Sequence, residues 1–266
     1  MVAVLYAAGM MVLMVYGLNL LWLSVGYANA DTLRPGRVPP AYRPPEPPAQ
    51  WPHVTVQIPL YNEQYVAERI IDACAALDYP TAKLEIQVLD DSTDETVEIA
   101  RERVIHWKKR GVSISHIHRD NRKGFKAGAL QNGMNIADTE LLAVFDADFV
   151  PRPDFLCRAV PYLRDSSVGM VQARWKHLNA ETSLLTRIQA MSLDVHFAIE
   201  QQVRQVFSCF INFNGTAGIW RRSCIEDAGG WEGDTLTEDL DLSYRAQLRG
   251  WNLRFLPRVS VPSELP

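Results

Sequence analysis

The chain has 266 residues, with 27 Lys or Arg against 31 Asp or Glu, which gives a formal net charge of −4 at pH 7. That length allows one large domain or two small ones with a substantial core, and the negative charge gives no support for a nucleic-acid partner. The four cysteines lack Cys-x-x-Cys or zinc-type spacing, so we expect reduced, mostly buried thiols in a cytosolic setting: Cys74, Cys157, Cys209 and Cys224.

Residues 1–30 carry no charged side chain and are predominantly apolar. As a helix, residues 2–27 would span roughly 39 Å, enough for a tilted membrane crossing. A cleaved signal peptide is the alternative, because Ala28-Asn29-Ala30 resembles a cleavage site. The length of the apolar stretch and the lack of preceding basic residues favour a transmembrane anchor over residues 1–30.

Three arginines follow this span and no basic residue precedes it: Arg34, Arg37 and Arg43. The positive-inside rule therefore predicts a globular part that faces the cytoplasm from the cell membrane. Residues 35–52 contain eight of the 16 prolines, so we interpret residues 31–52 as an extended, semi-rigid linker. An SH3-type ligand is the alternative interpretation of this proline-rich segment.

From residue 53 onward, short apolar runs alternate with segments of helical periodicity. Strands are predicted at residues 54–58, 84–89, 112–117, 141–145 and 168–173. Helices are predicted between them, with Ser92-x-x-Glu95 as a capping box and Asp154 as a second cap, and a long helix follows at residues 183–206. This alternation predicts an α/β fold with a doubly wound, mostly parallel sheet.

Asp146-Ala147-Asp148 follows the predicted strand at residues 141–145. Open α/β sheets bind ligands at the carboxyl ends of their strands. Paired carboxylates there suit Mg²⁺ or Mn²⁺ with nucleotide phosphates, although a solvated strand end has the same short pattern.

Two neighbouring strand ends offer groups for a nucleotide. Tyr61 follows the first strand and can stack on a base, and Asp91 follows the second and can accept from a base or ribose donor. Residues 90–94 could equally serve only to cap the next helix. Lys126, in the glycine-containing segment 120–128, can offset diphosphate charge, although a basic surface turn has the same composition. That segment matches neither a Walker A loop nor the G-x-G-x-x-G pattern.

Residues 213–218 form a glycine-containing loop with an amide and a hydroxyl that suit a sugar, although a tight turn would look the same. The tryptophans at 175, 220, 231 and 251 are interpreted as core or packing residues, with Trp231 the best candidate among them to stack on a sugar face. His196 is interpreted as a core histidine with its polar atoms satisfied. Thr237-Glu238-Asp239 opens a helix, and the helix start would keep Asp239 ionised and ready to accept a proton. The alternative is that Asp239 only caps the helix, while Glu238 or Asp241 acts as the base.

Taken in order, seven segments resemble the inverting family 2 glycosyltransferases of the GT-A fold: VQIPLYNE, VLDDSTD, RDNRKGFKAGAL, VFDADF, VQARW, FNGTAGIWRR and LTEDLDLSYR. The similarity covers about residues 52–266, and the segments look most like those of the cellulose-synthase-like glucomannan and glucan synthases. The resemblance implies that Tyr61, Asp91, Lys126 and Asp146 bind the nucleotide-sugar. It also implies a metal at Asp146 and Asp148, Asp239 as the base, and an acceptor bordered by Phe213, Asn214, Gly215, Thr216 and Glu238.

The family continues with a Gln-x-x-Arg-Trp motif and further membrane helices, so the resemblance implies that the domain is incomplete at its C-terminus. It implies metal-dependent transfer of a hexose from a UDP- or GDP-sugar to a growing β-linked glucan or mannan. A single base suits inversion by direct displacement. The alternatives are transfer of one sugar to a lipid carrier, or a silent nucleotide-sugar-binding module.

Overall fold

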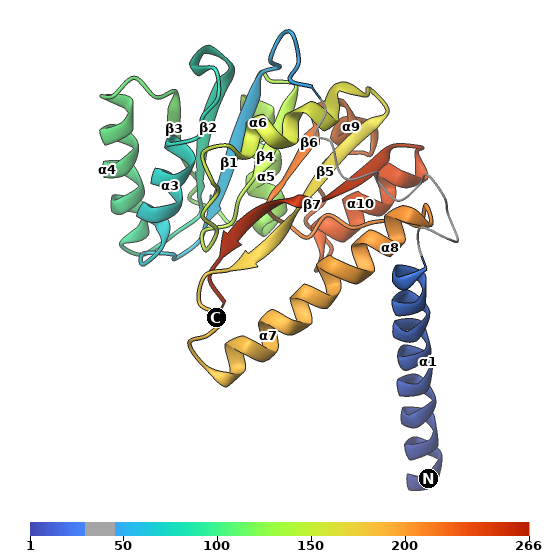
Figure 1. Ribbon diagram of the computed structural model, residues 1–266. Helices are drawn as coiled ribbons and strands as arrows, with labels where there is room; N and C mark the ends of the chain where they lie inside the picture. Colours follow the sequence, from blue (N-terminus) through green and yellow to red (C-terminus); the bar gives the residue numbers. More distant parts are fainter. Residues whose placement is uncertain (30–45, 266) are drawn as a thin grey trace.

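The computed structural model describes residues 1–29 and 46–265, so most of the predicted linker and its three arginines lie outside the described part. A seven-stranded sheet in the order β3-β2-β1-β4-β6-β5-β7 forms the centre of the globular part (Figure 1). Its strands have these bounds: β1 (Val54–Leu60), β2 (Leu84–Asp90), β3 (Ile114–His118), β4 (Leu141–Val144), β5 (Val168–His177), β6 (Gly218–Arg221) and β7 (Asn252–Ser263).

The strand directions confirm the predicted doubly wound, mostly parallel sheet. Strands β1 to β4 are mutually parallel, β5 and β7 are parallel, and β6 runs antiparallel to both of its neighbours. The chain adds β2 and β3 on one side of β1 and then places β4 on the other side. The loops after β1 and β4 therefore diverge, which opens a crevice at the carboxyl ends of these strands.

Helices cover both faces of the sheet. The core of one face contains residues of α3 (Ala67–Ala75), α4 (Thr96–Lys108) and α6 (Phe155–Ala159), near the 3-10 turns η1 (Thr81–Lys83) and η2 (Val160–Arg164). The core of the other face contains residues of α5 (Phe125–Ile136), α9 (Arg222–Asp227) and α10 (Glu238–Leu248). Apolar residues of the strands fill both interfaces, as the near-continuous apolar runs of buried parallel strands require.

The second core includes a cluster of aromatic rings. Trp231 is 7% exposed, and its ring centroid lies 6.0 Å from that of Trp220 and 6.3 Å from that of Phe213. Trp231 therefore packs in the core, as the interpretation of the tryptophans as core residues predicts, and its ring is too buried to stack on a sugar face.

The predicted long helix at residues 183–206 is present, but its middle differs from an α-helix. It consists of α7 (Leu184–Val195), a π-helical turn η3 (His196–Glu200) and α8 (Gln201–Val206). Ser183 caps its start, because the hydroxyl accepts from the backbone N–H of Thr186 at 3.0 Å. Periodicity along the sequence does not distinguish a single π turn from the α-helix around it.

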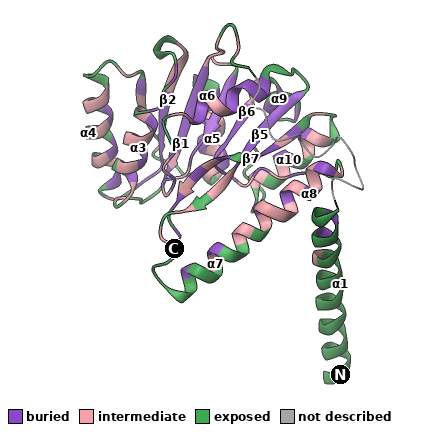
Figure 2. Ribbon diagram, viewed as in Figure 1, coloured by how far each residue is buried: buried purple, intermediate pink, exposed green. Residues whose placement is uncertain are grey.

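Helix α1 (Val2–Ala28) projects from the globular part and is exposed over most of its length (Figures 1 and 2). Among the described residues it is the one helix long and apolar enough to cross a membrane. Only its C-terminal end packs on the domain, where the rings of Trp22 and Phe207 lie 5.5 Å apart. A Cβ at Gly26 would lie 3.3 Å from Cγ1 of Val203, so a small residue permits this close approach.

Neither predicted side-chain cap is formed. Helix α4 begins at Thr96 without a side-chain cap bond, so the Ser92–Glu95 capping box is wrong. The Ser92 hydroxyl instead accepts from the backbone N–H of Asn62 at 2.9 Å, which links the loops after β2 and β1. Asp154 does precede α6, but its side chain makes no cap bond there.

The thiols are free, as expected, but only half of them are buried. Cys74 and Cys224 are buried, Cys157 is half-buried and Cys209 is exposed. Burial raises the pKa of Cys224 to about 12 and raises that of Cys74 further, so both stay protonated at neutral pH.

Candidate active site

A cavity of about 350 Å³ lies at the predicted crevice, against the loops that follow β1, β2 and β4. It brings together all five side chains predicted for the nucleotide-sugar and the metal: Tyr61, Asp91, Lys126, Asp146 and Asp148. Glu63 and Arg122 also line it, and neither was predicted from the sequence. Parallel strands place these loops together, because adjacent parallel strands end at the same edge of the sheet.

Asp91 is almost buried, and its carboxylate is held by Arg119. Nε of Arg119 donates to Oδ1 of Asp91 at 2.7 Å, and Nη2 donates to the other carboxylate oxygen. The same guanidinium donates to the carbonyl oxygens of Lys123 and Phe125, at 3.3 and 3.1 Å. This bidentate ion pair fixes the Asp91 side chain, and the same guanidinium links it to the loop before α5.

Tyr61 is 38% exposed at the mouth of the cavity. The guanidinium carbon of Arg122 lies 3.3 Å from the centre of the Tyr61 ring, in a cation–π arrangement. A flat ring and a flat cation at one place form a surface on which a nucleobase can stack.

Lys126 bridges two loops at the floor of the cavity. Its Nζ lies 2.5 Å from Oδ1 of Asp146 and donates to the carbonyl oxygen of Gly215 at 3.0 Å. Burial is the largest single influence and would lower the pKa of Lys126, but the carboxylates of Asp146, Glu238 and Asp239 together outweigh it and hold the pKa above its usual value. The lysine therefore remains a cation beside Asp146, where a diphosphate would need positive charge.

The carboxylates of the cavity repel one another. Burial raises the pKa of Asp148, and the neighbouring Asp146 raises it further. The pKa of Glu63 is also raised, by burial and then by Asp148 and Asp146. These carboxylates offer only oxygen ligands, and their negative charges repel one another. A hard divalent cation such as Mg²⁺ or Mn²⁺ would fit among them, because its charge would neutralise the repulsion.

The loop from Phe213 to Gly218 lies beside the cavity, where Lys126 contacts the carbonyl oxygen of Gly215. The Phe213 side chain is 1% exposed and packs in the core, so only its backbone can border the loop surface. Thr216 is also buried, and its hydroxyl accepts from the backbone N–H of Asp146 at 2.8 Å. The Thr216 side chain therefore positions the turn at Asp146. The family resemblance instead implies that Thr216 borders the acceptor.

Gly215 lies between Lys126 and Asp239. Its φ is +79°, in the left-handed region that glycine adopts without strain. A Cβ built there would lie 3.2 Å from Oδ2 of Asp239 and 3.3 Å from Nζ of Lys126. The absence of a side chain thus lets the loop pass between the predicted base and the lysine at the predicted phosphate site.

Asp239 lies in the first turn of α10, where its Oδ1 accepts from the backbone N–H of Leu240 at 2.8 Å. The sequence predicts that the helix start keeps this group ionised. In the structure, burial raises the pKa of Asp239, and the hydrogen bond from Leu240 and the charge of Lys126 only partly offset it. Burial likewise raises the pKa of Glu238. A carboxylate of raised pKa is a stronger proton acceptor.

His196 is half-buried and contacts the loop that the sequence predicts for the acceptor. Its Nε2 lies 3.2 Å from Oδ1 of Asn214, and its Nδ1 lies 2.9 Å from Oε2 of Glu200. Its polar atoms are satisfied, as predicted, but it stands at the surface of the π turn instead of in the core. Gln172 of β5 supports the same loop, because its Oε1 accepts from the backbone N–H of Asn214 at 2.9 Å.

Residues 52–266 match the family described as Glycosyltransferase like family 2. Glucomannan 4-beta-mannosyltransferase 1 of Oryza sativa subsp. japonica is 48% identical over 221 residues, which are 81% of this chain and 42% of the relative. Glucomannan 4-beta-mannosyltransferase 9 of Arabidopsis thaliana is 47% identical with the same coverage. The chain thus spans well under half of the length of these curated relatives.

Solved structures agree on the fold. The mannosyltransferase PcManGT from Pyrobaculum calidifontis, in complex with GDP-Man and Mn²⁺, superposes with a TM-score of 0.66 at 25% identity, over 93% of this chain and 68% of that one. TarS 1–349 of S. aureus in complex with UDP gives a TM-score of 0.60 at 15% identity, over 80% of this chain and 60% of that one. The match to the family profile covers the whole globular part of the sequence, and the chain belongs to glycosyltransferase family 2.

Proposed function

We propose that the chain carries the catalytic domain of a membrane-bound, metal-dependent, inverting glycosyltransferase that extends a β-linked mannan or glucomannan from GDP-mannose. The observation that carries this proposal is the single cavity that gathers Tyr61, Asp91, Lys126, Asp146 and Asp148. The sugar and base are taken from the relatives, which are named as glucomannan mannosyltransferases, and from the structural neighbour in complex with GDP-Man.

The donor would lie across the cavity with its base at Tyr61 and its diphosphate at Lys126. Asp91, fixed by Arg119, would accept a hydrogen bond from the base or ribose. Asp146 and Asp148 would hold Mg²⁺ or Mn²⁺, which supplies positive charge to the departing diphosphate. Mn²⁺ is the ion in the structural neighbour, so it is the first ion to test.

Asp239 would accept the proton from the acceptor hydroxyl as that oxygen attacks C1 of the sugar. The new C1–O bond forms while the bond from C1 to the diphosphate breaks, which inverts the configuration at C1. Glu238 and the backbone of the 213–216 loop would border the acceptor. Lys126 contacts the Gly215 carbonyl oxygen at 3.0 Å, so the acceptor loop and the diphosphate site are directly linked.

Membrane attachment through α1 is the remaining part of the proposal. Its apolar length suits a membrane crossing, and its C-terminal end packs on α8. With the domain on the cytoplasmic side, the cavity would face the compartment in which nucleotide-sugars are made.

The test is the Asp239→Asn variant, assayed in membranes with labelled GDP-mannose and a manno-oligosaccharide acceptor. We expect the variant to bind donor normally and to transfer sugar about 10² to 10⁴ times more slowly, which is the range of general-base catalysis. Because the base works only when ionised, wild-type kcat/KM should fall as the pH drops through the raised pKa of Asp239.

The matched control is Asp241→Asn, a carboxylate in the same first turn that pairs with Arg245. This control should keep its activity and the acid limb of its pH profile. Transfer at the wild-type rate by Asp239→Asn would contradict the assignment of the base. Analysis of the wild-type product then distinguishes the two possible activities: a β-linked polymer indicates polysaccharide synthesis, and a lipid that carries one mannose indicates transfer to a lipid carrier.

A further inference from the structure

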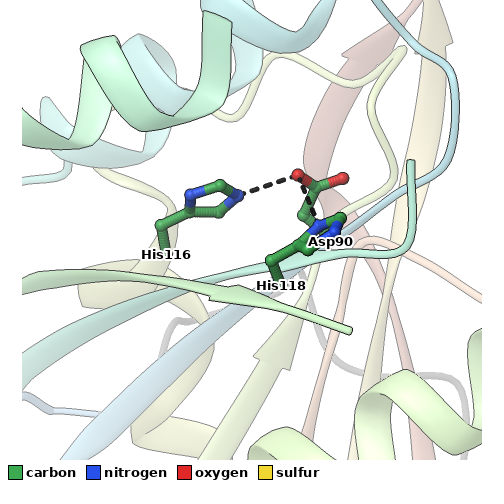
Figure 3. A group of neighbouring side chains, drawn as sticks. All are labelled: Asp90, His116 and His118. Atoms are coloured by element: carbon green, nitrogen blue, oxygen red, sulfur yellow. Dashed lines mark hydrogen bonds and ion pairs between the residues drawn. The ribbon is translucent and has the colours of Figure 1, made fainter. Parts of the chain in front are cut away.

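A second group of side chains that could ligate a metal ion lies outside the cavity, where β2 and β3 end (Figure 3). Asp90 is the last residue of β2, and His116 and His118 lie on β3, an edge strand of the sheet. Asp90 is opposite His118 in the strand register, and Val88 is opposite His116. Side chains two residues apart point to the same face of a strand, so both imidazoles share the face of the Asp90 carboxylate.

Both imidazole rings converge on one carboxylate oxygen. Nε2 of His116 lies 2.8 Å from Oδ2 of Asp90, and Nδ1 of His118 lies 3.4 Å from the same atom. The three ligand atoms all lie within 4.8 Å of one another. In a tetrahedral zinc site with bonds of 2.0 to 2.2 Å, ligand atoms are about 3.4 Å apart. Small side-chain movements would therefore place all three around one ion.

The surroundings of these ligands are those of a metal site. Asp90 is fully buried, and its second oxygen, Oδ1, accepts from the backbone N–H of Ser92 at 2.9 Å. Ligating carboxylates commonly have such an outer hydrogen-bond partner, which fixes their orientation. Nε2 of His118, the nitrogen away from the site, faces the exposed Asp120 carboxylate at 3.9 Å, beyond hydrogen-bond distance. His118 is 33% exposed, which leaves water access to a fourth position.

We propose that Asp90, His116 and His118 bind a divalent transition-metal ion of the zinc class. Two imidazoles and one carboxylate prefer Zn²⁺ over Mg²⁺, whereas the oxygen-only set at Asp146 and Asp148 prefers Mg²⁺ or Mn²⁺. The two sites therefore differ in the ions they select.

The position of this site gives the ion a structural consequence. Asp91 directly follows Asp90, and Arg119 directly follows His118. An ion bound by residues of both β2 and β3 would cross-link the ends of these two strands. Those ends directly precede Asp91 and Arg119, which contact each other. It would thereby stabilise an edge strand that hydrogen-bonds to only one neighbour in the sheet.

The test titrates Zn²⁺ into the purified full chain in detergent, with excess Mg²⁺ present to occupy the oxygen-only carboxylates. Calorimetry should show one Zn²⁺ bound per wild-type chain. His116→Ala and His118→Ala should each weaken zinc affinity by about 100-fold or more, since loss of a ligand costs at least as much as loss of an outer partner. The control is His53→Ala, a histidine beside Lys83 and outside the cluster, which should bind zinc as the wild type does.

Thermal unfolding gives a second readout that also shows whether the variants fold. A cooperative unfolding transition of His118→Ala would show that this variant folds. Zn²⁺ should raise the Tm of the wild type and of His53→Ala but not the Tm of His118→Ala, because a ligand stabilises only the state that binds it. Absence of zinc binding to the wild type in excess Mg²⁺ would overturn the proposal. Wild-type zinc affinity in both cluster variants would overturn it as well.

Discussion

At the residue scale, Gly215 lies where any side chain would press on both Asp239, the proposed base, and Lys126, proposed to contact the diphosphate. A methyl group there would be strained by the φ of +79° and would press on both Asp239 and Lys126. We predict that Gly215→Ala lowers the transfer rate by about 10²-fold, the cost of a misplacement of about 1 Å. We also predict that it lowers the free energy of unfolding by about 1 kcal/mol through backbone strain.

Gly111 provides the matched control for this prediction. Its φ is +85°, and within the described part of the chain no atom lies within 4 Å of an added Cβ. Gly111→Ala should therefore lose a similar amount of stability, measured by urea unfolding, and keep its transfer activity. Equal losses of activity in the two variants would show that strain alone, and not crowding of Asp239 and Lys126, explains the effect.

At the scale of elements, the π turn η3 contacts the loop of residues 213–216, which we propose borders the acceptor. His196 on this turn reaches Asn214 at 3.2 Å and is oriented by Glu200 at 2.9 Å. We predict that His196→Ala raises the KM for the acceptor by about tenfold, as expected when a loop loses a positioning hydrogen bond of about 1.4 kcal/mol. The affinity for GDP-mannose, measured by calorimetry, should not change.

Arg187→Ala is the control for the long helix, because Arg187 pairs with Glu181 at 3.3 Å and lies on α7, before the π turn. This variant should keep the wild-type KM for the acceptor. A tenfold rise in both variants would indicate a general loosening of the helix, and an unchanged KM in His196→Ala would remove His196 from the site.

The alternation of strands and helices could be predicted because buried strands and amphipathic helices have distinct periods in the sequence. Their ends could not. Strand β5 continues beyond the predicted residue 173 to His177, because it pairs with β7 as far as Ser263, almost ninety residues away in the sequence. The Ser92 capping box failed for a similar reason, since its hydroxyl is taken by the backbone of Asn62 in another loop.

At the scale of the whole molecule, α1 is the element that would hold the domain at a membrane. We predict that deletion of residues 1–30 moves the domain into the soluble fraction after cell lysis, because it removes the long apolar helix. Fractionation with detection of the domain checks this prediction. A control deletion within the proline-rich segment 35–45 should leave the protein in the membrane fraction.

A deleted protein that stays on membranes would show that other surfaces attach it. The apolar side chains exposed on α7 are the first to examine in that case: Leu184, Leu185, Ile188 and Met191. Recovery of a mature form that begins at Asp31 outside the cytoplasm would instead support the signal-peptide alternative.

The positions of the predicted carboxylates in the site follow from topology, whereas their neighbours do not. Asp91, Asp146 and Asp148 follow strands that end at one edge of a parallel sheet, so their convergence is readable from the sequence. Glu63 and Arg122 reach the cavity from irregular loops, and Asn62 adopts a φ of +57° beside one of them. Such backbone turns have no periodic signal, which is why sequence patterns missed these two side chains.

Metal-dependent binding of GDP-mannose tests the whole proposal most directly. Calorimetry with the full chain in detergent should show donor binding in the presence of Mn²⁺ and its loss on chelation. Asp148→Ala should abolish the metal-dependent part, because one of the paired carboxylates at the proposed metal site is gone, while circular dichroism shows an unchanged fold. Equal affinity in the wild type and the variant, with Mn²⁺ present, would contradict the metal-dependent site proposed for this cavity.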